Sequence, residues 1–209
     1  KIAEMNSIDE AADGGFTVGA AVSGAVLEEH PRFGKVWPGV LEALNLIGST
    51  QVQGRASAGG NLCNGSPAAD SVPAMLAAGA TVTLQGPDGR RQMPVEDVPA
   101  GPGRTNLAPG EVLVNFTLPP RPPGSSDAYL RMIPRTEMDI AVVGVGASVE
   151  LDEKCETFVS ARVALAAVAP TPLFVTDVGN QLAGQPVNDE TIKQAAQTAR
   201  AIASCRVQT

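Results

Sequence analysis

The sequence predicts an α+β fold in two parts. Strand-like segments joined by turns occur in both halves of the chain, and apolar residues at helical spacing occur near residue 40 and at the C-terminal end. Between the halves, residues 119–123 contain four prolines, and such a run is excluded from the interior of a sheet or a helix. We therefore predict a first domain over residues 1–119, a stiff linker over 120–126 and a second domain over 127–209.

The first part begins with a strand and a helix. Residues 16–22 follow a turn sequence and are rich in β-formers, which predicts a strand. Residues 36–47 carry apolar side chains at helical spacing, and Pro38 fits only the first turn of the predicted helix. Further along, residues 81–84 and 91–95 are predicted strands on either side of a Gly-Pro-Asp-Gly turn.

The remaining elements follow in order. Residues 111–118 predict another strand, and residues 139–151 and 158–168 predict an antiparallel hairpin around a charged turn. Residues 171–182 predict a helix, and Asp189 is the predicted cap of a last helix. The apolar face of that last helix is predicted to consist of Ile192, Ala195, Ala196, Ala199 and Ile202. The glycines of Gly144-Val145-Gly146 lie inside a strand pattern and indicate close packing.

Composition excludes several classes of function. The chain has 209 residues, 44% of them hydrophobic, and a net charge of −7, which disfavours binding to a nucleic-acid backbone. The sequence has no run of about 18 apolar residues, so a membrane span is not expected. Cys63, Cys155 and Cys205 are widely spaced and His30 is the single histidine, so we expect no metal site. The odd cysteine count favours a reducing, cytoplasmic location.

The segment from Ser57 to Asp70 is the candidate for chemistry. Paired glycines at 59 and 60 leave the backbone free of Cβ atoms, so that neighbouring N–H groups can converge on an anion. Ser66 followed by Pro67 predicts the start of a helix, and a glycine turn that leads into a helix is a recurring phosphate site. A tight turn with a helix cap and no ligand is the competing interpretation, and the segment alone leaves both open.

Blocks along nearly the whole chain resemble the FAD-binding subunit of the molybdenum hydroxylases, a family that includes the carbon monoxide dehydrogenase medium subunit and the central domain of xanthine dehydrogenase. The blocks are Gly19-Ala20, LIGSTQVQGR (46–55), SAGGN (57–61), SPAAD (66–70), PGEVL (109–113), MDIAVV (138–143) and AVAPTP (167–172). They occur in the family's order.

The resemblance implies FAD as the cofactor and assigns its contacts. The pyrophosphate would lie on the turn that contains Ser57, Gly59, Gly60 and Asn61. Asp70 matches a carboxylate on the polyol side of the flavin, and Ile47 and Leu113 match apolar positions beside the ring. Arg131 falls where the family can place a cation near the isoalloxazine, which would stabilise negative charge on the reduced ring. In the family, an upstream subdomain carries another glycine-rich turn for the same pyrophosphate, and this chain starts at Lys1, about where that subdomain should end.

The implied function is electron transfer within a heterotrimer. A large subunit would hold molybdopterin, and a small subunit would hold [2Fe-2S] clusters that pass electrons to FAD and then to an external acceptor. Two alternatives stay open. A stand-alone FAD oxidase would oxidise its own substrate, and a non-catalytic binding or assembly module would use the glycine turn only structurally.

Overall fold

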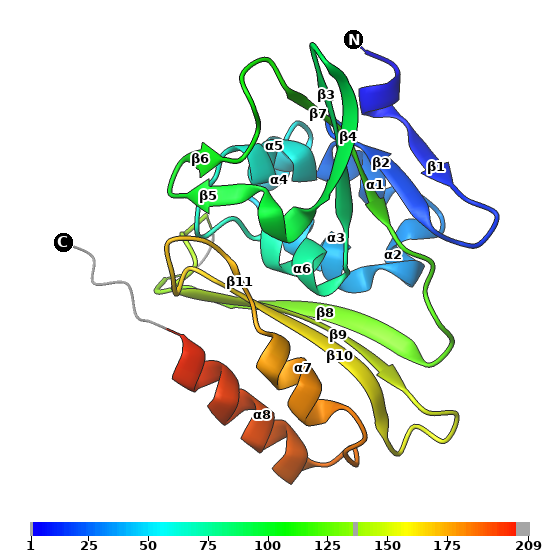
Figure 1. Cartoon of the computed structure of the whole chain (residues 1–209), viewed down its shortest axis with the longest axis vertical. Helices are drawn as coiled ribbons and strands as arrows, with labels where there is room; N and C mark the ends of the chain where they lie inside the picture. Colours follow the sequence, from blue (N-terminus) through cyan, green and yellow to red (C-terminus); the bar gives the residue numbers. More distant parts are fainter. Residues whose placement is uncertain (1, 136–137, 204–209) are drawn as a thin grey trace.

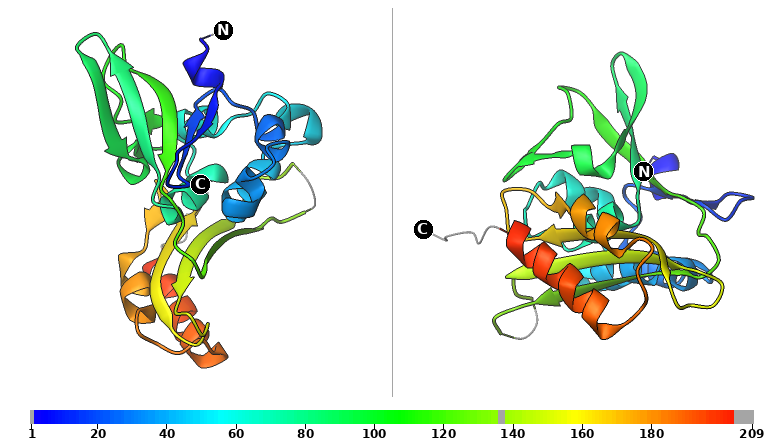
Figure 2. Two further views of the ribbon diagram at one scale, coloured as in Figure 1. Left: turned by 90° about the vertical axis from the view of Figure 1, so that its right-hand side faces the viewer. Right: turned by 60° about the horizontal axis from the view of Figure 1, so that its bottom comes forward.

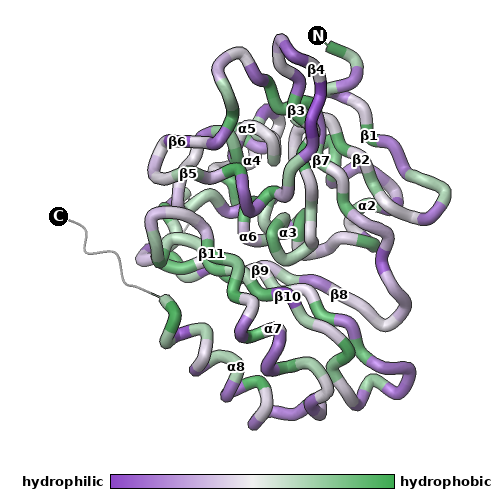
Figure 3. The backbone as a smooth tube through the Cα atoms, in the orientation of Figure 1, coloured by the Kyte–Doolittle hydropathy of each residue, from purple (hydrophilic) through white to green (hydrophobic). Residues whose placement is uncertain are grey.

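A computed structural model describes residues 2–135 and 138–203, and Cys205 lies outside them. The N-terminal part holds a five-stranded antiparallel sheet in the order β1-β2-β7-β3-β4. Its strands are β1 (Ile8–Glu10), β2 (Phe16–Gly19), β3 (Thr81–Gly86), β4 (Gly89–Pro94) and β7 (Val112–Leu118). The edge strand β4 is hydrophilic over most of its length (Figure 3), and a polar edge protects a sheet from pairing with other chains.

Short helices connect the strands of this part. They are η1 (Glu4–Asn6), α1 (Gly24–Glu28), α2 (Phe33–Val36), α3 (Pro38–Asn45), α4 (Thr50–Gln53), α5 (Ala58–Cys63), α6 (Ser71–Ala77) and η2 (Val95–Asp97). The strands β5 (Pro99–Gly101) and β6 (Arg104–Thr105) form a small separate ribbon.

The C-terminal part is a second antiparallel sheet between two layers of helices. Its strands are β8 (Ser125–Met132), β9 (Val143–Leu151), β10 (Phe158–Ala166) and β11 (Leu173–Phe174), in the order β11-β10-β9-β8. Helices α3 and α6 of the N-terminal part pack on one face. Helices α7 (Thr176–Leu182) and α8 (Asp189–Ile202) lie on the other (Figures 1 and 2).

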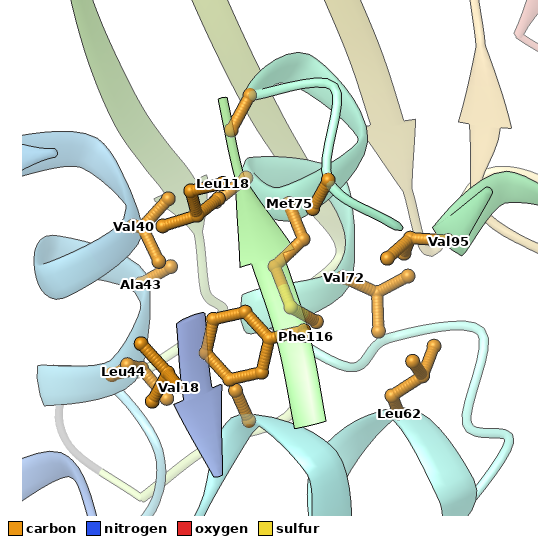
Figure 4. Close-up of a cluster of buried hydrophobic side chains, with 14 of the residues drawn as sticks. Val18, Val40, Ala43, Leu44, Leu62, Val72, Met75, Val95, Phe116 and Leu118 are labelled. Atoms are coloured by element: carbon orange, nitrogen blue, oxygen red, sulfur yellow. The ribbon is translucent and has the colours of Figure 1, made fainter. Parts of the chain in front are cut away.

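The main core lies between the first sheet and the helices α3 and α6. Phe116 of β7 is at its centre, surrounded by Val18, Leu44 and Met75 (Figure 4). Tyr129 of β8 and Ala164 of β10 belong to the same cluster, so side chains of the second sheet complete the first core. A smaller cluster joins β9 and β10 to α7 and α8.

Several predicted elements are confirmed with shifted ends. The predicted helix over residues 36–47 is α3, and Pro38 is its first residue. The predicted hairpin is β9 and β10, with Phe158 opposite Leu151, but residues 139–142 precede the strand. The predicted strand over 16–22 ends at Gly19, because the chain turns there and Val22 N donates to the Gly19 carbonyl.

Two predictions about the C-terminal helices are wrong, and a third holds only in part. The predicted helix at 171 begins at Thr176, because Leu173–Phe174 pair with β10 instead. The last helix is capped by Asn188, whose Oδ1 accepts a hydrogen bond from Thr191 N at 2.9 Å, and Asp189 is its first residue. Of the predicted face of α8, Ala195 is buried but Ile192 is 50% exposed, because α8 packs on α7 in an outer layer.

The proline run lies outside helices and strands and is attached to the N-terminal part through Arg121. β8 begins at Ser125, inside the segment 120–126 that was predicted as a linker. Arg121 lies over the Trp37 ring at 4.3 Å and donates to the Val36 carbonyl at 2.6 Å. It also pairs with Asp127. The run therefore lies against α2 and α3 and is not a free spacer. The two-domain division itself stays a prediction.

Candidate functional site

The predicted glycine turn is the first turn of a short helix. Ser57 is the N-cap of α5, and its Oγ accepts a hydrogen bond from Gly60 N at 3.1 Å. The helix predicted to begin at Ser66 and Pro67 begins at Ser71 instead, and Asp70 immediately precedes it. Ser66 was predicted to cap the helix that leads to Met75, but the serine that caps a helix in this segment is Ser57, at the start of α5.

The two glycines of α5 have different surroundings. A Cβ on Gly59 would lie 2.6 Å from the Ala20 carbonyl oxygen, so this glycine lets α5 approach the turn after β2. A Cβ on Gly60 would meet only Ser57 Oγ, at 3.1 Å, and Gly60 is exposed. Gly59 is thus required by packing, whereas Gly60 leaves open backbone at the surface.

Two adjoining hollows meet at this helix, and a third lies beside them. One of about 410 Å³ is lined by Ser57, Gly59, Gly60 and Leu113, with Met5, Ala20, Ala21, Cys63, Leu107, Glu111 and Val112. A second, of about 330 Å³, is lined by Ile47, Arg55, Ala56, Ser57, Gly60, Asn61 and Asn64. A third, of about 690 Å³, shares Met5 and Ala21 with the first and Arg55 with the second. The structure thus brings six of the eight predicted residues to this surface, with Ile47 and Leu113 in different hollows.

The side chain of Asn61 is turned toward the next helix. Its Oδ1 accepts hydrogen bonds from Ser71 Oγ at 2.7 Å and from Ser71 N at 3.2 Å. Ser71 is fully buried, so this contact attaches the end of the glycine sequence to the start of α6.

Asp70 and Arg131 bind each other. Asp70 Oδ2 accepts from Arg131 Nη1 at 2.8 Å, and Asp70 Oδ1 accepts from Tyr129 Oη at 2.7 Å. Both charged side chains are about nine-tenths buried, and neither lines the three hollows. Burial raises the pKa of Asp70, an effect that its two hydrogen-bond donors partly offset, and burial foremost raises the pKa of Tyr129. Direct contact of this pair with the cofactor stays a prediction.

The sequence reasoning missed several residues of the site. Glu111 lines the 410 Å³ hollow, and its carboxylate binds Arg91 Nε at 2.6 Å and Ala108 N at 2.6 Å, which lowers its pKa to about 2. Its signal was its place in the PGEVL block. Met5 and Ala21 are distant in sequence from the glycines, so no local pattern marks them. Tyr129 carries no signal except its closeness to Arg131. Cys63 lines the same hollow and is exposed at the surface, and partial desolvation of its thiol raises its pKa.

Within residues 2–135 and 138–203, two other kinds of feature are absent. No helix there combines the length and apolar character required to cross a bilayer. Within the same residues, no group of three or more histidine, cysteine, aspartate or glutamate side chains is placed to hold a metal ion.

The fold and the site together define a class of protein. A capped glycine helix with exposed backbone between two hollows, one of them walled largely by apolar side chains, fits a domain that binds an extended organic cofactor. Residues 1–121 match the FAD-binding domain in molybdopterin dehydrogenase, and residues 128–208 match the C-terminal domain of CO dehydrogenase flavoprotein. The chain belongs to this family of FAD-binding proteins.

Individual relatives agree with this assignment. The xanthine dehydrogenase FAD-binding subunit of Escherichia coli O157:H7 is 31% identical over 92% of this chain and 65% of the relative. The carbon monoxide dehydrogenase medium chain of Afipia carboxidovorans is 31% identical over 87% of this chain and 64% of the relative. The chain thus spans about two thirds of the length of these curated relatives.

The structure of a carbon monoxide dehydrogenase from Hydrogenophaga pseudoflava superposes with a TM-score of 0.92. It is 29% identical in sequence and covers 99% of this chain and 71% of its own. The resemblance noted in the sequence is therefore confirmed, and so is the predicted α+β fold.

Proposed function

We propose that this chain is the FAD-binding, electron-transfer subunit of a molybdopterin-dependent hydroxylase. Its role would be to take electrons from the iron–sulfur clusters of a small partner subunit and deliver them to an external acceptor. A large partner subunit would hold molybdopterin and select the substrate. Family membership supports FAD as the cofactor. The observation that carries the proposal is the exposed Gly60 backbone between hollows that contain Ile47 on one side and Leu113 on the other.

The residues present fit an extended anionic cofactor with a flat apolar end. The absence of a Cβ at Gly60 leaves room for a pyrophosphate against the backbone, and Arg55 adds a positive charge in the adjoining hollow. Leu113 and Met5 offer apolar contact for a ring. When bound, FAD would supply the redox chemistry, and the contribution of the protein would be to hold and orient it. The polyol contact of Asp70 and the ring contact of Arg131 are part of the proposal.

The proposal extends to the organisation of the whole protein. The chain would comprise the FAD-binding domain over residues 1–119, the linker over 120–126 and the C-terminal domain over 127–209. A cytoplasmic heterotrimer is proposed. Following the family resemblance, an upstream subdomain with a second glycine-rich turn would complete the pyrophosphate site.

Purification of the native protein tests the proposal. The gene product would be tagged in its source cells, purified gently, and examined for its visible spectrum and for the flavin released on denaturation. FAD, iron–sulfur absorbance and two co-purifying chains are expected. A yellow monomer that an alcohol reduces directly would instead indicate an oxidase, and a colourless protein without partners would indicate a binding module.

A substitution at Gly60 tests the position of the cofactor. Gly60→Asp should reduce FAD affinity at least about tenfold, because a carboxylate would repel the pyrophosphate at close range. Gly60→Ala is the matched control, since it adds a methyl group without charge and should lose much less. Both variants would be checked for folding by circular dichroism and for FAD by equilibrium dialysis. A folded Gly60→Asp protein with unchanged FAD occupancy would contradict the proposed site.

A further inference from the structure

Tyr129 links the second sheet to the connection between α5 and α6. It lies in β8, is 2% exposed and donates its hydroxyl proton to Asp70 Oδ1 at 2.7 Å. Its backbone N–H donates to Glu42 Oε2 of α3 at 2.9 Å. The residue is therefore fixed at both its backbone and its side chain, and its hydroxyl contacts a residue outside its own sheet.

The residues that follow extend this link to the glycine helix. Asp70 is bonded covalently to Ser71, and Ser71 donates two hydrogen bonds to Asn61 Oδ1, at 2.7 and 3.2 Å. Asn61 follows Gly60 directly in α5. A continuous set of contacts thus runs from Tyr129 through Asp70, Ser71 and Asn61 to the helix on which the hollows meet. We call these four residues the α5 relay.

The second sheet is shaped to admit this link. Gly144 and Gly146 lie on the same face of β9. A Cβ on Gly144 would collide with Tyr129 Oη, and a Cβ on Gly146 would collide with the Pro73 carbonyl oxygen of α6. The Gly144-Val145-Gly146 sequence is explained by these two approaches, one to Tyr129 and one to α6.

Asp127 provides an internal comparison. It lies two residues before Tyr129 on the same buried face of β8, accepts a hydrogen bond from Val40 N at 3.1 Å and pairs with Arg121. Its contacts reach α3 and the proline run, and α5 is not among the elements they reach. The same strand is therefore anchored at two places. Asp127 leads to α3 and the proline run, whereas Tyr129, together with Arg131, leads to Asp70 and so to the proposed cofactor site.

We propose that Tyr129 is a positioning residue for the cofactor site. Through the α5 relay it holds α5 in the orientation that keeps the Gly60 backbone open to the hollows. The inference rests on the proposed function for the identity of the cofactor. The position of α5 itself is measurable without a cofactor.

The test compares Tyr129→Phe with Asp127→Asn in the full-length protein. FAD affinity would be measured by fluorescence titration, and hydrogen exchange of the amides of residues 58–63 would be measured by mass spectrometry without FAD. Tyr129→Phe should weaken FAD binding about tenfold, which is the size of a typical coupling between sites. The same substitution should also speed hydrogen exchange in α5. Asp127→Asn should lower the thermal midpoint at least as much while it leaves both α5 readouts near wild type.

Ser71→Ala provides a second entry into the relay if Tyr129→Phe folds poorly. It removes the 2.7 Å hydrogen bond to Asn61 and should weaken FAD binding in the same direction. Combined with Tyr129→Phe, it should add less than its separate effect, because both changes interrupt one path.

The outcomes separate the two claims. Equal effects of Tyr129→Phe and Asp127→Asn on both readouts would overturn the positioning role and leave Tyr129 a stabilising residue only. Suppose that hydrogen exchange in α5 is faster in Tyr129→Phe and unchanged in Asp127→Asn, but the wild-type protein binds no FAD. This result would support the positioning role and refute the proposed function. FAD binding by the wild-type protein, with no selective effect of Tyr129→Phe on α5, would support the proposed function and overturn the positioning role.

Discussion

Two buried carboxylates, Asp70 and Asp127, lie where the second sheet packs on the N-terminal part, and similar contacts give them different roles. Asp127 pairs with Arg121 and accepts from Val40 N, whereas Asp70 pairs with Arg131 and accepts from Tyr129. Burial raises the pKa of both carboxyl groups, and their arginine partners act in the opposite direction. The difference lies in what each carboxylate adjoins. Asp127 anchors β8 to α3, and Asp70 adjoins the residue that holds α5. A buried ion pair is thus identified as structural or site-related by its neighbours and not by its own geometry.

The largest effect is expected when the contacts of Asp127 are removed. Asp127→Asn should lower the free energy of unfolding by about 3 kcal/mol, because Arg121 would be left buried without its counter-charge. Urea denaturation followed by far-ultraviolet circular dichroism measures this. Arg135→Ala, which removes an ion pair whose arginine is 80% exposed, is the control and should cost less than about 1 kcal/mol. Similar losses in the two variants would show that the Asp127 pair is not a structural anchor.

A smaller effect is expected from the glycines that admit each anchor. A Cβ on Gly39 would lie 2.6 Å from Asp127 Oδ2 and 2.7 Å from Ala128 N, whereas one on Gly144 would meet the Tyr129 hydroxyl. Gly39→Ala and Gly144→Ala should each cost about 1–3 kcal/mol by overpacking, with Gly39→Ala the more costly because backbone is less free to shift. Thermal unfolding would rank them. Gly144→Ala alone should also speed exchange in α5, and an effect of Gly39→Ala there would weaken the distinction between the anchors.

The smallest effect is a difference in pH dependence between Asp70 and Glu111. The folded-state pKa of Asp70 is raised, so the stability it contributes is greatest below its ordinary pKa of 3.8 and declines as the pH rises through the raised value. The pKa of Glu111 is lowered to about 2, so its contribution is present above the ordinary value of 4.5 and is lost as the pH falls toward 2. Differences in unfolding free energy between wild type and Asp70→Asn, or wild type and Glu111→Gln, should therefore have opposite slopes with pH. Parallel slopes would contradict the assignment.

Local patterns predicted the elements that depend on local interactions. The helix with Pro38 in its first turn and the hairpin of β9 and β10 were confirmed, since periodicity and turn residues specify such units. The start of α6 was predicted wrongly, because Ser66-Pro67 is a helix signal that the surrounding structure does not use. Leu173–Phe174 became a strand because β10 offered an edge for pairing, which no local sequence reveals.

The candidate site divides in the same way. Its glycines and the flanking Ile47 and Leu113 were recognised from sequence blocks, and six of the eight assigned residues lie at the three hollows. The sequence did not predict that Asp70 and Arg131 pair with each other. It also did not predict the hydrogen bond from Tyr129 to Asp70. Asp70 is about 60 positions from Tyr129 and Arg131 in the sequence, so their contact depends on how β8 packs against the start of α6.

By itself, the sequence determined the α+β class, the family and the glycine segment that the proposed cofactor would contact. It did so because residue spacing records local conformation, and motif order records descent. The tertiary structure alone decided which charges face each other and which glycines are required for close approach. The physical reason is that a buried charge must find its partner across the fold, and the energy of that pairing depends on burial that only the packed sheets and helices create.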